Sequence, residues 1–212
     1  ILGDYGDAPD QLFANYNSVD PLKVAQFPST TSGGEGKPFV VHHNPLAEVF
    51  FGENATVEED AILVDRDDDD GWVPTTMQAC APAQLIVHVT VPDGASAGPL
   101  YLNALFDWDH SGRWLGSLAC PVEETIFPGP AAAGGQAAVP GGYPGSAAPE
   151  WAIQNVRLDL PPYELPPGFS GNIVLPPILT GALSGEMWVR FTLTTVPVDE
   201  DDFQPAALGG GG

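Results

Sequence analysis

Glycine and proline recur so closely along this chain that little of it can form a long helix. The 212 residues include 25 glycines and 23 prolines, and both residue types interrupt helices and mark turns. The segments between them alternate apolar and polar residues, as half-buried strands do. We expect strands at 84–91, 99–107, 153–160 and 186–194, and shorter ones at 38–42, 47–51, 61–64, 72–76 and 171–175. This spacing predicts an all-β fold, an antiparallel β-sandwich of the immunoglobulin-like or jelly-roll-like kind.

Composition divides the chain into an irregular N-terminal part and a more regular remainder. Residues 1–75 carry most of the acids and are predicted to form an arm packed on the sandwich, with one or two helical turns at 21–27. The sandwich domain itself is expected over 76–203. Within it, 18 of the 23 residues at 128–150 are Ala, Gly or Pro, a composition typical of a surface insertion. The tail, 204–212, is expected to be flexible.

The net charge limits the partners that the chain can bind. The chain has 6 basic and 28 acidic residues, which gives a net charge of −22. Phosphate groups repel such a chain, so nucleic acids and anionic membrane surfaces are poor partners. The longest uncharged stretches are broken by Pro and Gly, which excludes membrane insertion as a helix. A hydrophobic content of 43% also argues against a wholly disordered chain.

The acidic residues gather in short clusters. Residues 58–70 hold eight of them, and further groups lie at 4–10, 107–109, 123–124 and 199–202. Like charges at this spacing repel one another unless a cation neutralises them, and hard cations prefer carboxylate oxygens. We therefore expect bound Ca²⁺. The alternative is an acidic, salt-tolerant surface without bound ions.

The sharpest local motif is the loop that follows the strand expected at 99–107. Asp107, Asp109 and Ser111 occupy positions 1, 3 and 5 of a calcium loop of the EF-hand type. Gly112 at position 6 permits the turn, and the carbonyl of Arg113 is the expected ligand at position 7. The alternative interpretation is an acidic hairpin turn.

The remaining ligands of this predicted site come from elsewhere. Position 12 is Leu118 instead of Glu, which excludes a helix–loop–helix hand. Glu123 or Glu124 is expected to complete the coordination shell of the calcium ion. The other clusters are expected to supply ligands too, because alternate residues of an extended segment point the same way. The predicted ligands there are Asp65, Asp67, Asp68, Asp69, Asp70, Asp4, Asp7, Asp10, Asp201 and Asp202.

Two cysteines and the first residue indicate an exported protein. Cys80 and Cys120 are the only cysteines, and a disulfide between them is expected in an oxidising compartment. It would close a loop of about 40 residues, worth about 4 kcal/mol in the chain-entropy model. The alternative is two unrelated buried thiols. The chain begins at Ile1, so we expect a processed, secreted product.

Four segments share an order known from one protein family. They are GDYGDAPD (3–10), the acidic run ending in Gly71-Trp72, LYLNALFDWDHSGRW (100–114) and WVRFTLTTVPVDEDDF (188–203). Together they resemble the GEVED-domain modules of bacterial secreted and cell-surface proteins. Those modules begin with DYGDAPD and continue with a DDEDGV run, an aWiDFNgDGdW hairpin, and an Arg-containing strand with the GEVEDY signature. The resemblance implies an extracellular β-sandwich with bound calcium and no known catalysis, and it leaves the partner open.

These observations predict a secreted, calcium-stabilised structural or adhesive surface protein. A self-assembling subunit of an extracellular filament or surface layer is the form of this role that we expect. The expected partners are copies of itself, other surface proteins or glycans. No catalytic motif is recognised, so we expect no enzyme; a hydrolase with acidic catalysts is the weaker rival. The main alternative is a carbohydrate-binding module with an exposed aromatic platform. Its candidate residues are Trp108, Trp114, Trp151 and Trp188.

Overall fold

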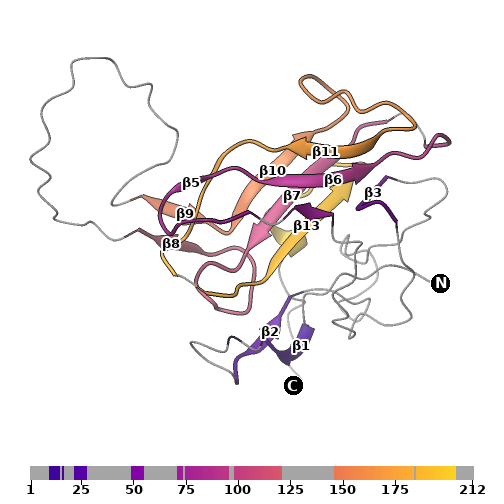
Figure 1. The fold of residues 1–212 in the computed structure, drawn as a ribbon. Coiled ribbons are helices and arrows are strands. Elements are labelled where there is room, and N and C mark those ends of the chain that lie inside the picture. Colours follow the sequence, from indigo (N-terminus) through magenta and orange to yellow (C-terminus); the bar gives the residue numbers. More distant parts are fainter. Residues whose placement is uncertain are drawn as a thin grey trace, which may run out of the picture.

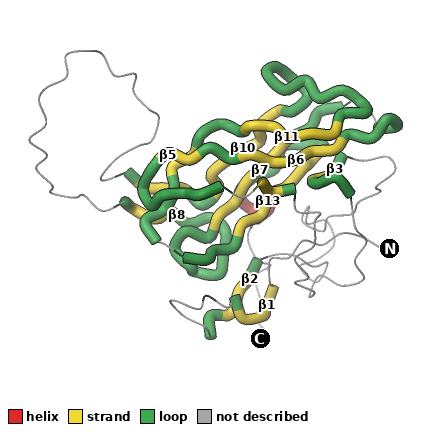
Figure 2. Tube along the Cα trace, in the orientation of Figure 1, coloured by secondary structure: helices red, strands yellow, loops and turns green. Residues whose placement is uncertain are grey.

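The computed structural model describes the parts of the chain that build a β-sandwich. These are residues 10–14, 16, 22–27, 49–54, 71–73, 75–95, 98–120, 146–183 and 185–203. Strands, turns and loops make up almost all of them (Figures 1 and 2), and their one helical segment is the 3₁₀ helix η2, Glu200–Phe203. No helix among these residues combines the length and the apolar character needed to cross a membrane.

Two antiparallel sheets face each other and confirm the predicted all-β sandwich (Figure 1). The first sheet has the order β10-β7-β13, formed by Trp151–Arg157, Tyr101–Phe106 and Val189–Thr194. The second has the order β11-β6-β3, with β4 also paired to β6, formed by Ser170–Val174, Ile86–Thr90, Phe50–Phe51 and Trp72–Val73. β3 and β4 come from the first 75 residues, so this part of the predicted arm belongs to the sandwich sheet.

The main core lies between the two sheets. Val87 and Val89 on β6 are fully buried, and they pack in one cluster with Leu102 and Phe106 of β7. Alternate residues of β6 point into this cluster, which confirms the alternation of apolar and polar residues that predicts a half-buried strand at 84–91. Burying apolar surface stabilises the folded state by about 25 cal/mol per Å². A slip of one residue would turn these side chains to the other face of the sheet, so the alternation fixes the register of the central strands.

A second core covers the opposite face of β7. Strand β1 (Asp10–Phe13) pairs with β2 (Val24–Gln26), and we call these strands, together with Ala14, Tyr16 and Phe27, the N-terminal hairpin. Its buried side chains pack with residues of the first sheet and of the C-terminal segment. The cluster comprises Ala14, Tyr16, Ala25, Phe27, Leu105, Trp114, Trp151, Val198 and Phe203.

The helical turns predicted for 21–27 are wrong, because residues 24–26 are extended and pair with β1. The exposure of this segment alternates, with Val24 exposed and both Ala25 and Phe27 fully buried. That alternation matches the period of a strand. The tertiary contacts of the second core therefore override the weak local preference for helix.

Two small two-stranded sheets and a disulfide lie at the end of the molecule marked by β5, β8 and β9 (Figure 1). β8 (Ser117–Ala119) pairs with β9 (Ala147–Pro149), and β5 (Pro82–Ala83) pairs with β12 (Ile178–Leu179). The predicted Cys80–Cys120 disulfide is present, with its Cα atoms 5.6 Å apart. Ala148 is fully buried, so the sequence assigned to a surface insertion over 128–150 ends in a structured strand.

Candidate metal centre

The candidate site begins where β7 ends. Phe106 and Trp108 stack with their ring centroids 4.4 Å apart and their planes parallel to within 1°. Trp108 is 1% exposed, and its indole N–H donates to the carbonyl of Pro149 at 3.0 Å. These two rings anchor the chain in the main core on either side of Asp107. The carboxylates of Asp107 and Asp109 are therefore held by a rigid part of the fold.

Asp107 organises the loop that follows it. Its Oδ1 accepts the backbone N–H of Ser111 at 2.8 Å and the Ser111 hydroxyl at 3.3 Å. Its Oδ2 accepts the backbone N–H of Gly112 at 2.8 Å and the hydroxyl of Tyr16. Gly112 has a φ of +77°, a conformation that glycine adopts at little cost. The turn predicted at position 6 of the loop is confirmed.

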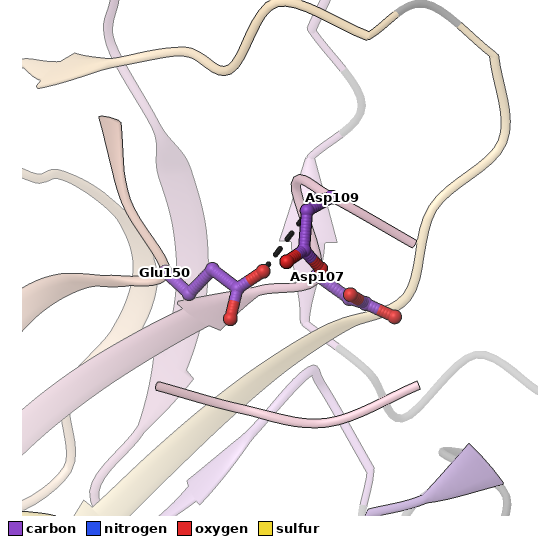
Figure 3. Close-up of side chains that lie close together, drawn as sticks. All are labelled: Asp107, Asp109 and Glu150. Carbon is purple, nitrogen blue, oxygen red and sulfur yellow. Dashed lines mark hydrogen bonds between the residues drawn. The ribbon is translucent and has the colours of Figure 1, made fainter. Parts of the chain in front are cut away.

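Glu150 reaches the same place from the start of β10. Trp151 pairs with Leu105, so Glu150 lies beside Phe106, whose N–H donates to the Glu150 carbonyl at 2.8 Å. The Glu150 side chain is fully buried. Its oxygens accept the backbone N–H of Gly116 and, at 3.4 Å, that of Asp109. Figure 3 shows the Glu150 side chain pointing toward Asp109, with Asp107 beside Asp109 in the same loop.

Asp107, Asp109 and Glu150, which we call the carboxylate triad, form a group that could hold a metal ion. Each offers an oxygen that lies within 4.8 Å of an oxygen of the other two. Asp107 and Glu150 are fully buried, whereas Asp109 is exposed. An ion could therefore approach from the side of Asp109. Three carboxylates this close repel one another when all are ionised.

Burial shifts the pKa values of the triad in a consistent way. Desolvation raises the pKa of Asp107 to about 6, although the hydrogen bonds from Tyr16 and Gly112 oppose this shift. Burial and the charge of Asp109 raise the pKa of Glu150 to about 8. Burial also acts to raise the pKa of Asp109, but hydrogen bonds from Ser111 outweigh it and the pKa is lowered. Without a cation, Glu150 is therefore mostly protonated at neutral pH, whereas Asp107 is mostly ionised there and takes up its proton below about pH 6.

The structure places the other predicted loop oxygens beside the triad. The Ser111 hydroxyl lies 3.3 Å from Asp107 Oδ1 and 3.4 Å from the carbonyl oxygen of Arg113. The oxygens expected at positions 1, 5 and 7 are thus neighbours. Together with Asp109 and Glu150 they form a set of oxygen donors, of the kind that hard cations bind.

Of the remaining predicted ligands, the structure describes the side chains of Asp201 and Asp202 alone, and these are not among the residues grouped at the triad. Asp201 and Asp202 lie in η2, where the Asp202 carboxylate accepts the N–H of Asp199 at 2.9 Å and Asp199 accepts that of Asp201 at 3.0 Å. Asp10 is described as the first residue of β1, without its side chain. The others fall outside the described residues. They are Asp4, Asp7, Asp65, Asp67, Asp68, Asp69, Asp70, Glu123 and Glu124.

Sequence reasoning missed Glu150 and Tyr16. Glu150 is the one acidic residue between Glu124 and Asp159, and this isolation was the signal available. Its role depends on the pairing of β10 with β7, which joins residues more than 40 positions apart. Tyr16 has no comparable signal, because its contact with Asp107 spans 91 residues.

The aromatic platform predicted for a carbohydrate-binding module is wrong for the four tryptophans named. Trp108, Trp114 and Trp151 are at most 8% exposed and belong to the two cores. Trp188 is half-buried, and its indole N–H donates to the carbonyl of Ala14 at 2.8 Å. The rings of Trp108, Trp114 and Trp151 therefore pack inside the fold and offer no flat surface to a sugar.

The site thus joins two strand ends, a buried tyrosine and a loop of oxygen donors. Its hydrogen bonds run from backbone and hydroxyl donors to the carboxylates, which fixes their positions. Such an arrangement suits the binding of a cation by preformed oxygens. Comparison of the chain with protein-family models, with curated proteins and with solved structures finds no match.

Proposed function

We propose that this chain is an extracellular, calcium-stabilised β-sandwich with a structural or adhesive role. The observation that carries the proposal is the convergence of Asp107, Asp109 and Glu150 within 4.8 Å. An ion there would bridge the loop after β7 and the start of β10. It would also relieve the repulsion among three carboxylates, two of them fully buried. The disulfide supports an extracellular location, since disulfides persist in oxidising compartments.

Calcium is the cation that the donor set favours. All the candidate ligands are oxygens: three carboxylates, the Ser111 hydroxyl and the Arg113 carbonyl. Zinc and copper prefer nitrogen and sulfur donors. Magnesium demands near-ideal octahedral geometry, whereas calcium accepts six to eight oxygens in irregular arrangements. A loop of mixed carboxylate, hydroxyl and carbonyl donors fits calcium better.

Calcium is expected to raise the melting temperature strongly at pH 8. An ion bound only to the folded state adds about 2.7 kcal/mol at one hundred times its Kd, which corresponds to roughly 5–11 °C for a chain of this size. Differential scanning calorimetry with calcium and with a chelator measures this shift. The Asp107→Asn/Asp109→Asn variant should lose most of it.

Asp201→Asn/Asp202→Asn is the matched control, because it removes the same charge from η2, whose acidic residues are not part of the triad. This variant should keep the calcium shift of the parent. Equal shifts in both double variants would assign the effect to general charge screening and would contradict a site at the triad. Equal melting curves of the parent in calcium and in chelator would contradict the proposed function.

A self-assembling role is the second part of the proposal, supported by an edge of the sandwich. β11 ends the order β11-β6-β3, and within the described residues it pairs with β6 alone. Its Val174 side chain is 49% exposed. Open strand edges carry unpaired N–H and C=O groups that can pair with another chain. Calcium would lower the repulsion between subunits that each carry a charge of −22.

Calcium is therefore expected to promote self-association of the full chain. Light scattering and negative-stain microscopy at about 10 mM calcium, above the Kd range of extracellular sites, should show species larger than the monomer. A chain that lacks residues 1–9, which precede β1, should associate less. A monomer at high protein concentration in calcium would leave only the stabilising role of the ion.

A further inference from the structure

The N-terminal hairpin rests directly on the loop that carries the triad. The backbone N–H of Gln26 donates to the carbonyl of Gly112 at 2.7 Å. A Cβ on Gly112 would lie 3.1 Å from the carbonyl oxygen of Val24 and 3.2 Å from the Cα of Ala25. Phe27 and Trp114 contact each other with ring centroids 4.1 Å apart. The loop is thus part of the surface that holds the hairpin.

Tyr16 connects the hairpin to the triad itself. Its side chain is 2% exposed, and its ring stacks on His110 with the centroids 4.4 Å apart. Its hydroxyl donates to Asp107 Oδ2. A buried side chain of the hairpin therefore contacts a candidate ligand and the residue in the middle of the candidate loop.

The two oxygens of Asp107 have different surroundings. Oδ2 accepts Tyr16 and the Gly112 N–H, while Oδ1 accepts the N–H and hydroxyl of Ser111. These four bonds fill the acceptor sites of a carboxylate. The bond from the Ser111 hydroxyl to Oδ1 is 3.3 Å, and that hydroxyl has a second acceptor in the Arg113 carbonyl at 3.4 Å. Oδ1 is therefore the oxygen that can be freed for a cation at least cost.

We infer that Tyr16 is a positioning residue that holds Asp107 with Oδ1 toward a bound cation and couples cation binding to docking of the N-terminal hairpin. The inference rests on the proposed function, since it assigns calcium to the triad. Partners that hydrogen-bond a ligating carboxylate typically change metal affinity 10- to 100-fold when they are removed. Coupling is reciprocal. If docking of the hairpin raises the affinity for calcium by some factor, bound calcium must raise the docking equilibrium constant of the hairpin by the same factor.

The first test is Tyr16→Phe in the full chain, with calcium affinity measured by titration calorimetry. The variant keeps the ring on His110 and loses the bond to Asp107, so we expect the Kd to rise about 10- to 100-fold. Tyr163→Phe is the matched control, because its hydroxyl donates to the Val174 carbonyl and has no contact with the loop. That variant should bind calcium like the parent. An unchanged Kd in folded Tyr16→Phe would overturn the inference.

The second test uses the parent chain and depends on no variant. Lys23 lies in the hairpin, where its carbonyl accepts the N–H of Ala14 at 2.8 Å. Cleavage by trypsin after Lys23 requires the hairpin to open, so saturating calcium should slow release of the 1–23 fragment by at least tenfold relative to chelator. Mass spectrometry follows this fragment, and an intact, unstructured peptide with one lysine, cleaved under the same conditions, corrects for any effect of calcium on trypsin.

The outcomes separate the inference from the proposed function. If the parent binds no calcium, both fail. If the parent binds calcium but the rate of cleavage after Lys23 is the same with calcium and with chelator, the proposed function stands and the coupling is overturned. A lower melting temperature of Tyr16→Phe in chelator, together with the parental Kd, would assign Tyr16 a purely structural role and would also overturn it.

Discussion

Glu150→Gln is expected to stabilise the calcium-free protein at pH 8 and to weaken its binding of calcium. Burial raises the pKa of Glu150 to about 8, while in the unfolded chain it titrates near its ordinary value of about 4.3. The folded state therefore favours the protonated form. In calcium-free protein this stabilisation is fully present below about pH 4.3 and is lost as the pH rises to about 8.

Glutamine cannot ionise, so the variant avoids this loss. Its one amide oxygen can still accept the N–H of Gly116, and only the long bond from the Asp109 N–H, 3.4 Å in the parent, is given up. In chelator the stability of parent and variant should be similar near pH 4 and differ by a few kcal/mol at pH 8. Urea unfolding across this pH range measures the difference. Calcium should reverse the order at pH 8, because the variant has lost a charged ligand.

Glu53→Gln is the control for this experiment, since Glu53 is exposed in the bend after β3. It should follow the parent in chelator and in calcium. A Glu150→Gln variant that loses stability in chelator at pH 8 would mean that Glu150 is ionised and favourably paired in the folded protein. The raised pKa and the argument for a cation at this position would then both be wrong.

Removal of the disulfide is the second change with a large expected effect. The Cys80–Cys120 bond joins residues 40 positions apart, and closing such a loop in the unfolded chain is worth about 4 kcal/mol. The Cys80→Ala/Cys120→Ala variant should therefore melt roughly 8–16 °C lower than the parent. Thermal unfolding followed by circular dichroism gives this shift. Reduction of the parent should lower its melting temperature similarly.

Calcium-free conditions are needed for that comparison, because the disulfide fixes the end of β8, and β8 pairs with β9 just before Glu150. Loss of the bond could otherwise be masked by a change in calcium affinity. A melting temperature within 2 °C of the parent in chelator would show that the unfolded chain is already restrained in this region, and that the chain-entropy value does not apply to it.

Local patterns in the sequence predicted those parts of the site that lie close together along the chain. The alternation at 84–91 and the 107–113 spacing depend on neighbouring residues, and both are found in the structure. Glu150 could not be predicted, because the Ala- and Pro-rich sequence before it gives no strand signal and β9 is held by its pairing with β8. The same holds for Tyr16, whose environment is made by segments far away in the sequence.

The contacts of the N-terminal hairpin also have a consequence for the order of folding. The bond from the Trp188 indole to the Ala14 carbonyl joins residues 174 positions apart, and that from Tyr16 to Asp107 spans 91. A chain is made from its N-terminus, so the surface that receives the hairpin is incomplete until Trp188 has been synthesised. Closing such long loops is slow. The hairpin is therefore synthesised well before the segments that receive it, and it is among the last of the described parts of the fold to reach its native contacts.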